Sequence, residues 1–257
     1  QFEFKDMTAN VERMRITSDG NVRIGSTAGG TQPLCIAGSD SSGVNLQFQN
    51  STTGNNSNDG VLIGLSGGED GQFWNYENNN LLFGTNNTES MRVDNGGRLL
   101  IGTTSSRSPG GIEASFQVEG TGAADSSITM VRNSNDVNPA YLILGKSRGT
   151  SNGSNTIVAD DDNIGSIQWA AADGTDIGST AAYITCAVDG GPGANDMPGR
   201  LLFGTTPNGS NSPVTRLRIT ENGFTKITSN NNYVNVNGLY HELNSHISNA
   251  QNLIIES

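Results

Sequence analysis

Hydrophobic and polar residues alternate along most of the chain, in short runs separated by Gly, Asn and Asp. Three of these runs align without gaps: residues 12–25 (ERMRITSDGNVRIG), 89–102 (ESMRVDNGGRLLIG) and 215–228 (TRLRITENGFTKIT). Because successive side chains of a strand point to opposite faces, Met14 and Ile16 are expected on one face and Arg15 and Thr17 on the other. Each run therefore predicts two short antiparallel strands.

Between the two strands of each run lies a turn signal. Asp-Gly or Asn-Gly pairs supply the positive φ that a tight hairpin turn needs. The three pairs are Asp19-Gly20, Asn95-Gly96 and Asn222-Gly223. The sequence thus predicts one β-hairpin three times over.

Each hairpin closes a larger module. LLFGT precedes the second and the third hairpin, at residues 81–85 and 201–205. Residues 43–50 resemble residues 127–133, and residues 61–66 resemble residues 142–147. The predicted divisions are the end of one module (1–27), a first module (28–104), a second module (105–229) with inserted strands at 149–199, and the start of a C-terminal region (230–257).

The composition favours an assembly over a monomeric globule. Only 33% of the residues are hydrophobic, whereas 34 are Gly, so large side chains for a core are scarce. Many short strands with open edges are an aggregation hazard unless sister chains cover them. We expect an all-β, elongated, fibrous homotrimer of repeated β-modules, built as a triple-stranded β-prism or an interleaved β-helix, with little or no helix. Tyr240–Ser248 is the one helix-like stretch.

Charge and cysteine content exclude some partners. The net charge of −11 opposes binding to nucleic acid and attraction to an anionic membrane. No apolar run has the length of a membrane span. Cys35 and Cys186 are too few for a disulfide scaffold, so we expect free thiols and assembly in a reducing cytoplasm. Gln1 and the apolar run Leu253–Ile255 suggest a cut at each end.

The hairpin motif resembles a repeat in tail fibres and related virion proteins of tailed phages. The resemblance rests on MRIT-x-DGNVxIG at the first hairpin, its two relatives, and the tail NGLYHELNSHISNAQNLII. Such modules commonly precede an endosialidase-type intramolecular chaperone domain, whose own signature is missing here; the tail is similar to fibres of marine and cyanobacterial phages. The resemblance implies a virion tail-fibre protein that partners other tail proteins and a host-surface glycan or protein receptor.

Two other kinds of function remain open. A depolymerase tailspike that cuts surface polysaccharide would need paired carboxylates, and Glu69 with Asp70 or Asp173 with Asp176 are available. These pairs lie in Gly-rich loops typical of turns, so no catalytic residue is named and no enzyme is expected. A bacterial adhesin or a capsid-attached fibre is the third possibility.

A few residues are candidates for specific contacts. Arg15, Arg92 and Arg218 recur at equal places, and we interpret them as structural contacts to a neighbouring chain, with receptor phosphate or sulfate as the alternative. Trp74, Tyr76 and Trp169 are candidate glycan contacts, and the insert 149–199 is the expected place for a receptor.

Metal binding has weak candidates. Asp160–Asp162 offers hard oxygen ligands for Ca²⁺, but the spacing is not that of a calcium loop, and a solvated loop is the simpler interpretation. His241 and His246 lack the further ligands of a zinc site. No cofactor is expected.

Overall fold

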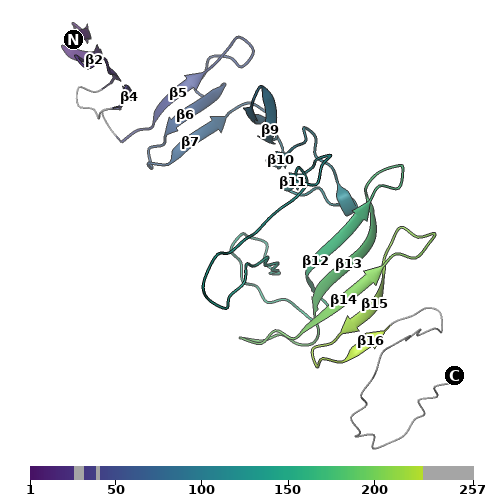
Figure 1. Cartoon of the computed structure of the whole chain (residues 1–257). Coiled ribbons are helices and arrows are strands. Elements are labelled where there is room, and N and C mark those ends of the chain that lie inside the picture. The colour runs from purple at the N-terminus through teal and green to yellow at the C-terminus, as the bar shows by residue number, and fades with distance from the viewer. Residues whose placement is uncertain (26–31, 39–40, 228–257) are drawn as a thin grey trace, which may run out of the picture. The chain divides into compact units, whose positions relative to one another are not determined.

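The computed structural model describes residues 1–25, 32–38 and 41–227. Within these ranges the chain forms sixteen β-strands, one 3-10 turn, η1 (Pro109–Gly111), and no α-helix. Figure 1 shows how the strands follow one another along the chain. The expected all-β fold is confirmed. Contacts divide the chain into two compact units, Gln1–Arg107 with Glu113–Thr129, and Ser108–Ile112 with Met130 onward. The module boundaries expected from the repeats stay a prediction, and both the tail 230–257 and Tyr240–Ser248 lie outside the described residues.

The described residues of the first unit form three sheets. The first has the order β1-β2-β3-β4, the second β5-β6-β7, and the third β11-β10-β9-β8. Their strands are β1 (Phe2–Asp6), β2 (Val11–Ile16), β3 (Val22–Ile24), β4 (Leu34–Ile36), β5 (Val44–Phe48), β6 (Val61–Leu65), β7 (Gly71–Asn75), β8 (Leu81–Thr85), β9 (Thr88–Val93), β10 (Leu99–Ile101) and β11 (Phe116–Val118).

Up to residue 227, the second unit forms one antiparallel sheet whose strands follow the sequence order. Its strands are β12 (Asn163–Ala171), β13 (Ser179–Val188), β14 (Gly199–Thr205), β15 (Val214–Ile219) and β16 (Thr225–Ile227). Strands β12 and β13 lie within residues 149–199, where the sequence predicts inserted strands. By contrast, residues 127–133 and 142–147 form no strand, although their counterparts around β5 and β6 do.

All three predicted hairpins are present and share one register. Strands β2 and β3, β9 and β10, and β15 and β16 pair antiparallel. In each hairpin the first Met or Leu lies opposite an Ile: Met14 opposite Ile24, Met91 opposite Ile101, Leu217 opposite Ile227. The gap-free alignment of the sequence is therefore a spatial alignment as well.

The turns differ from the two-residue form expected from Asp-Gly and Asn-Gly. In the second hairpin Gly97 N donates to Asp94 O, and Asp94 N donates to Arg98 O, so three residues form the loop. Only the third of them has positive φ: Gly20 (83°), Gly97 (79°) and Gly223 (76°). This is a type I turn followed by a left-handed residue. Gly97 rather than Gly96 is thus the required glycine, because Gly97 has positive φ and Gly96 does not.

A preceding strand completes each hairpin, and a β-bulge interrupts the pairing at the same place. Phe4 lies opposite Met14, Phe83 opposite Met91, and Phe203 opposite Leu217. One residue later along the preceding strand, the register shifts in all three sheets. The residues without a partner opposite them are Arg13, Ser90 and Arg216. Strand β1 was not predicted, because FEFKD shares little identity with LLFGT.

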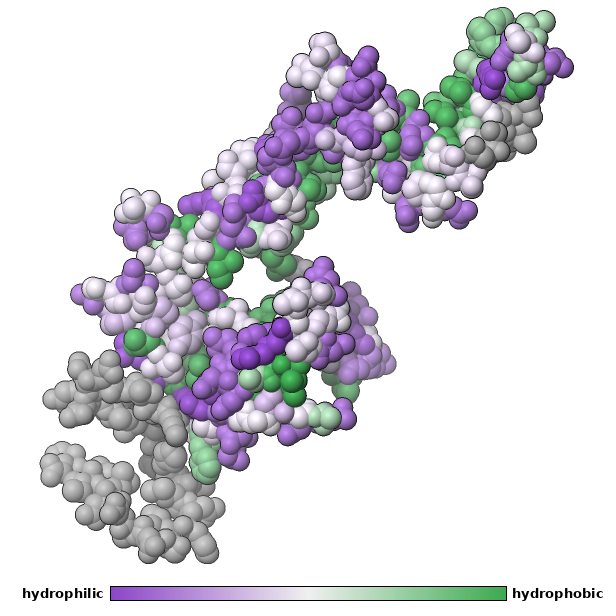
Figure 2. Space-filling model, turned by 180° about the vertical axis from the view of Figure 1, so that it is seen from behind, coloured by the Kyte–Doolittle hydropathy of each residue, from purple (hydrophilic) through white to green (hydrophobic). Residues whose placement is uncertain are grey.

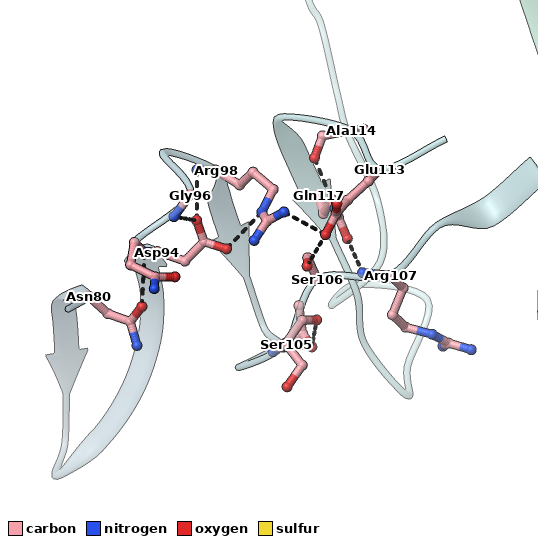
Figure 3. Close-up of polar contacts among 12 residues, drawn as sticks. Asn80, Asp94, Gly96, Arg98, Ser105, Ser106, Arg107, Glu113, Ala114 and Gln117 are labelled. Carbon is pink, nitrogen blue, oxygen red and sulfur yellow. Dashed lines mark hydrogen bonds and ion pairs between the residues drawn. The ribbon is translucent and has the colours of Figure 1, made fainter. Parts of the chain in front are cut away.

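A short parallel strand follows the first two hairpins. Strand β4 pairs with β3, and β11 pairs with β10. Polar contacts hold the connection before β11, as Figure 3 shows. Arg98 bonds to Asp94 in its own turn (2.8 Å) and to Glu113 across the connection (2.5 Å), while Gln117 accepts from Arg107 N (2.9 Å). These contacts fix β11 beside β10.

The chain buries little apolar side-chain volume by itself. Among the described residues the buried apolar side chains are Leu62, Leu100, Val158, Ala187 and Val188. Many large apolar side chains are instead open to solvent, and Figure 2 shows hydrophobic areas at the surface between hydrophilic ones. Because burial of apolar surface is the main stabilising term in folding, this exposure leaves the described part of the single chain with only a small core.

Candidate functional site

Each sheet has one face made almost entirely of apolar side chains. Residues that lie directly opposite one another across paired strands share a face, so the register defines these surfaces. On the β1–β4 sheet the apolar face consists of Phe2, Phe4, Met14, Ile16, Val22, Ile24, Leu34 and Ile36. On the β8–β11 sheet it consists of Leu81, Phe83, Met91, Val93, Leu99, Ile101, Phe116 and Val118.

The other two sheets repeat this arrangement. On the β5–β7 sheet the apolar face contains Val44, Leu46, Phe48, Val61, Ile63, Leu65 and Phe73. On the β12–β16 sheet it contains Ile167, Trp169, Ile184, Leu201, Phe203, Leu217 and Ile219. The faces of two consecutive sheets meet, since the rings of Phe73 and Phe83 lie 6.3 Å apart. We call these surfaces the apolar faces; sequence alternation indicated them only at the hairpins.

The opposite face of the hairpins carries Arg15 and Arg92, and each bonds to a glutamate three residues earlier. Arg92 Nε bonds to Glu89 Oε1 at 2.6 Å, and Arg92 Nη2 to Glu89 Oε2 at 2.7 Å. Arg15 makes the same forked contact with Glu12. Residues three apart on a regular strand point to opposite faces, but the bulge residue between them restores a common face. The bulge thus explains the spacing of Glu and Arg in the motif.

We expect this ion pair to make the stability of the fold depend on pH in the acid range. The hydrogen bond from Arg92 holds the pKa of Glu89 below its ordinary value of 4.5, and burial opposes this in part. Since the pKa is lowered in the folded state, the pair stabilises the fold above the ordinary pKa, and this stability is lost as the pH falls. We expect Glu89→Gln to flatten the fall in melting temperature below about pH 4.5, where unperturbed glutamates protonate.

Thermal melts at a series of pH values measure this effect. Glu69→Gln, in the turn between β6 and β7, removes the same charge away from the ion pair and serves as the control. Identical pH profiles for the two variants would show that the pair of Glu89 and Arg92 contributes nothing to stability.

The third hairpin replaces the local pair with a longer contact. Thr215 stands where Glu12 and Glu89 stand in the other copies, and Arg218 bonds instead to Asp189, which follows β13. Asp189 also accepts from Arg200 (3.1 Å) and from Glu221 N (3.1 Å). Burial raises the pKa of Asp189, but these hydrogen bonds and the charge of Arg218 outweigh it, so the pKa is lowered.

Asp189 thereby ties the insert to the last hairpin, and sequence reasoning missed it. It lies 29 residues before Arg218 and belongs to no repeat. The described contacts of Arg15, Arg92 and Arg218 are within the chain. A contact from these arginines to a neighbouring chain stays a prediction.

The three consecutive aspartates serve separate partners. Asp162 bonds to Arg148 (2.6 Å) and Lys146 (3.0 Å), and these contacts, with a hydrogen bond from Ala159 N, lower its pKa. Asp161 pairs with Arg200, and Asp160 accepts from Gly190 N (2.8 Å). Across the described residues no group of three ligand-type side chains converges on a point. The three carboxylates hold this loop in place through ion pairs and hydrogen bonds.

The candidate aromatic residues divide between two different faces. Trp74 and Tyr76 lie on the polar face of the β5–β7 sheet, with ring centroids 6.3 Å apart, and Trp74 is 55% exposed. Trp169 lies on the apolar face of the β12–β16 sheet. Trp74 and Tyr76 therefore form an open aromatic pair, whereas Trp169 is part of an apolar face.

The remaining candidates from the sequence are a carboxylate pair, the two cysteines and the two histidines. Asp173 accepts from Thr175 N and Asp176 N, which shapes the turn after β12. Cys35 and Cys186 are free and half-buried. Among the described residues no helix is long and apolar enough to cross a membrane. His241 and His246 lie outside the described residues.

Comparison with known proteins gives matches among solved structures alone. No family model matches the chain, and no curated protein matches it. The carboxy-terminal domain of the bacteriophage T5 L-shaped tail fibre aligns over 100% of this chain and 99% of its own, with 15% identity and a TM-score of 0.48.

The same domain with its intramolecular chaperone domain aligns with a TM-score of 0.51. Identity is again 15%, and the alignment covers 84% of this chain and 57% of that chain. The chain thus spans little more than half of this second structure. At this level of similarity the fold is what is shared. The chain has the all-β fold seen in the carboxy-terminal domain of a phage tail fibre.

Proposed function

We propose that the chain is a structural, non-catalytic subunit of a phage tail fibre, forming part of its shaft or lower body. The observation that carries this proposal is the series of four apolar faces, one on each described sheet, whose large side chains are exposed or only half-buried in the single chain. The fold shared with the T5 tail fibre domain supports the same conclusion. A subunit of this kind holds a receptor-binding tip away from the particle.

The proposal includes assembly as a homotrimer with the apolar faces inward. Three copies of each face, placed around one axis, would remove these side chains from water and supply the core that the single chain lacks. The bulge-supported ion pairs of Arg15 and Arg92 would then lie on the outer side of each sheet. The net charge of −11 keeps such an assembly soluble.

Adsorption follows from multivalency in this proposal. Three chains per fibre and several fibres per particle raise the avidity for a host-surface glycan or protein without a tight single site. Other tail proteins would anchor the fibre to the particle. The fibre would assemble in the host cytoplasm before it becomes part of the virion.

Purified particles test the proposed location. We expect mass spectrometry to detect the chain in virions and antibody labelling in electron micrographs to place it on the tail fibres. Labelling of the head would favour a capsid fibre, and virions that lack the chain would refute the proposal.

The open aromatic pair is the best candidate for a weak glycan contact. We expect Trp74→Ala with Tyr76→Ala to lower binding of the assembled protein to host cells by roughly 100-fold, since an aromatic contact is worth about 1 kcal/mol and the loss is repeated in three copies. Fluorescent protein on intact cells measures this. Leu82→Ala, which also removes an exposed side chain, should bind like the unaltered protein, and equal binding by all variants would exclude the pair.

A further inference from the structure

Two segments of the chain have the side-chain pattern of strands but no main-chain hydrogen bonds of a sheet. We name residues 127–131 and residues 141–146 the two unpaired segments. Their backbone groups make no hydrogen bond to any described residue. Their apolar side chains are open to solvent, with Val131 72% and Ile143 81% exposed. Backbone groups and large apolar side chains are both satisfied when such a segment joins a sheet.

The first unit shows what these sequences form when they are paired. SITMVRN resembles the sequence around β5, and LILGKS resembles the sequence around β6. Strands β5 and β6 pair antiparallel, and β6 also pairs with β7. The counterpart of β7 is β12. Each contains a Gly followed two residues later by a side chain of the apolar face, which is Phe73 in β7 and Ile167 in β12. Among the described strands β12 ends its sheet, with one edge unpaired.

We propose that the two unpaired segments are β-strands donated to a neighbouring copy of the chain. Residues 141–146 pair antiparallel with the free edge of β12 in that copy, and residues 127–131 add outside them. The order then matches β5-β6-β7 of the first unit. This inference rests on the homo-oligomer in the proposed function and specifies which main-chain contacts join its subunits.

The chain's own contacts argue against pairing with its own β12. Leu144 lies over Gly165: a Cβ built on Gly165 would stand 2.6 Å from Leu144 Cβ. Residues opposite each other on paired antiparallel strands have Cβ atoms about 4.5–5.5 Å apart. Leu144 is too close for this, so it lies against the face of β12 and is not paired along the edge of β12. Lys146 and Arg148 are both tied to Asp162, just before β12. The segment thus leaves its own sheet at this corner.

The connection between the two strands also differs between the units. Five residues, 66–70, join β6 to β7, which is a hairpin loop within one chain. Residues 147–162 separate the second unpaired segment from β12. A longer connection allows an identical element to be exchanged between protomers, as in domain swapping.

Hydrogen exchange and disulfide trapping on the whole chain test the exchange. We expect the amides of residues 128–131 and 142–145 to be protected in the oligomer as strongly as those of β12. The native cysteines are first removed by Cys35→Ala and Cys186→Ala. The test pair is then Ile143→Cys with Gln168→Cys, because these positions are equivalent to Leu62 and Trp74, which lie opposite each other in the first unit. This pair should link chains into covalent trimers on a non-reducing denaturing gel.

The control pair is Leu65→Cys with Gly71→Cys, whose positions pair within one chain. It should give a linked monomer. Three results would each overturn the strand exchange and leave the trimer standing. They are rapid hydrogen exchange at the amides of the two unpaired segments in a trimer, a disulfide within one chain for the test pair, and no disulfide for the test pair while the control pair forms one. A monomeric mass for the folded protein would instead remove the proposed function itself.

Discussion

Phe83→Asp should strongly weaken assembly of the chain. Phe83 is 40% exposed at the centre of the apolar face of the β8–β11 sheet, where it lies opposite Met91 and contacts Phe73. In the proposed trimer three copies of this side chain come together, and an unpaired carboxylate there costs several kcal/mol. Every 1.4 kcal/mol is about a factor of ten, so we expect assembly to weaken by roughly 100-fold or more.

Leu82→Asp is the matched control for this effect. Leu82 is the preceding residue of the same strand, is 58% exposed, and lies opposite Arg92 on the other face of the sheet. A carboxylate at this position stays in water beside a cation, so the assembly should persist. Sedimentation of both variants over a concentration series measures the difference. Equal loss of assembly in both, or in neither, would contradict the inward orientation of the apolar faces.

Leu100→Ala should cause the largest loss of stability among single truncations. Leu100 is fully buried in the β8–β11 sheet, in the row that contains Arg92 and Gln117. Truncation removes three carbons and leaves a cavity under neighbours that relax only in part. We expect a loss of about 3 kcal/mol in the free energy of unfolding.

Leu82→Ala provides the comparison, since it is the same chemical change in the same row of the sheet but at an exposed position. Its cost should stay below about 1 kcal/mol. Denaturant unfolding followed by circular dichroism measures both variants. A loss for Leu100→Ala no larger than that for Leu82→Ala would show that the small core of the single chain does not stabilise this sheet.

Local sequence signals predicted the hairpins well. Alternation and glycine at a fixed place specify two strands and a turn within about fifteen residues, and the three aligned copies made the pattern unambiguous. The bulge was not predictable in the same way, because an extra residue changes the facing of every side chain before it while leaving the composition unchanged. The spacing of Glu89 and Arg92 is explained only once Ser90 is seen to be that extra residue.

Contacts between distant residues could not be predicted from one sequence. Strands β4 and β11 have three residues each, which is too short for periodicity, and their parallel pairing depends on contacts such as that of Arg98 with Glu113. Asp189 carries no local sign that it binds Arg218. Trp74 and Trp169 look alike in sequence, and only the strand register separates the open aromatic pair from the apolar face.

The mass of the folded chain in solution tests the central claim most directly. Size-exclusion chromatography with light scattering, on protein whose circular dichroism shows β-structure, should give three times the 26.9 kDa of one chain. The proposed trimer, in which three copies of each apolar face cover one another, predicts this mass. A folded protein with a mass of 26.9 kDa at micromolar concentration would contradict it, because the four apolar faces would then be stable in water without a partner.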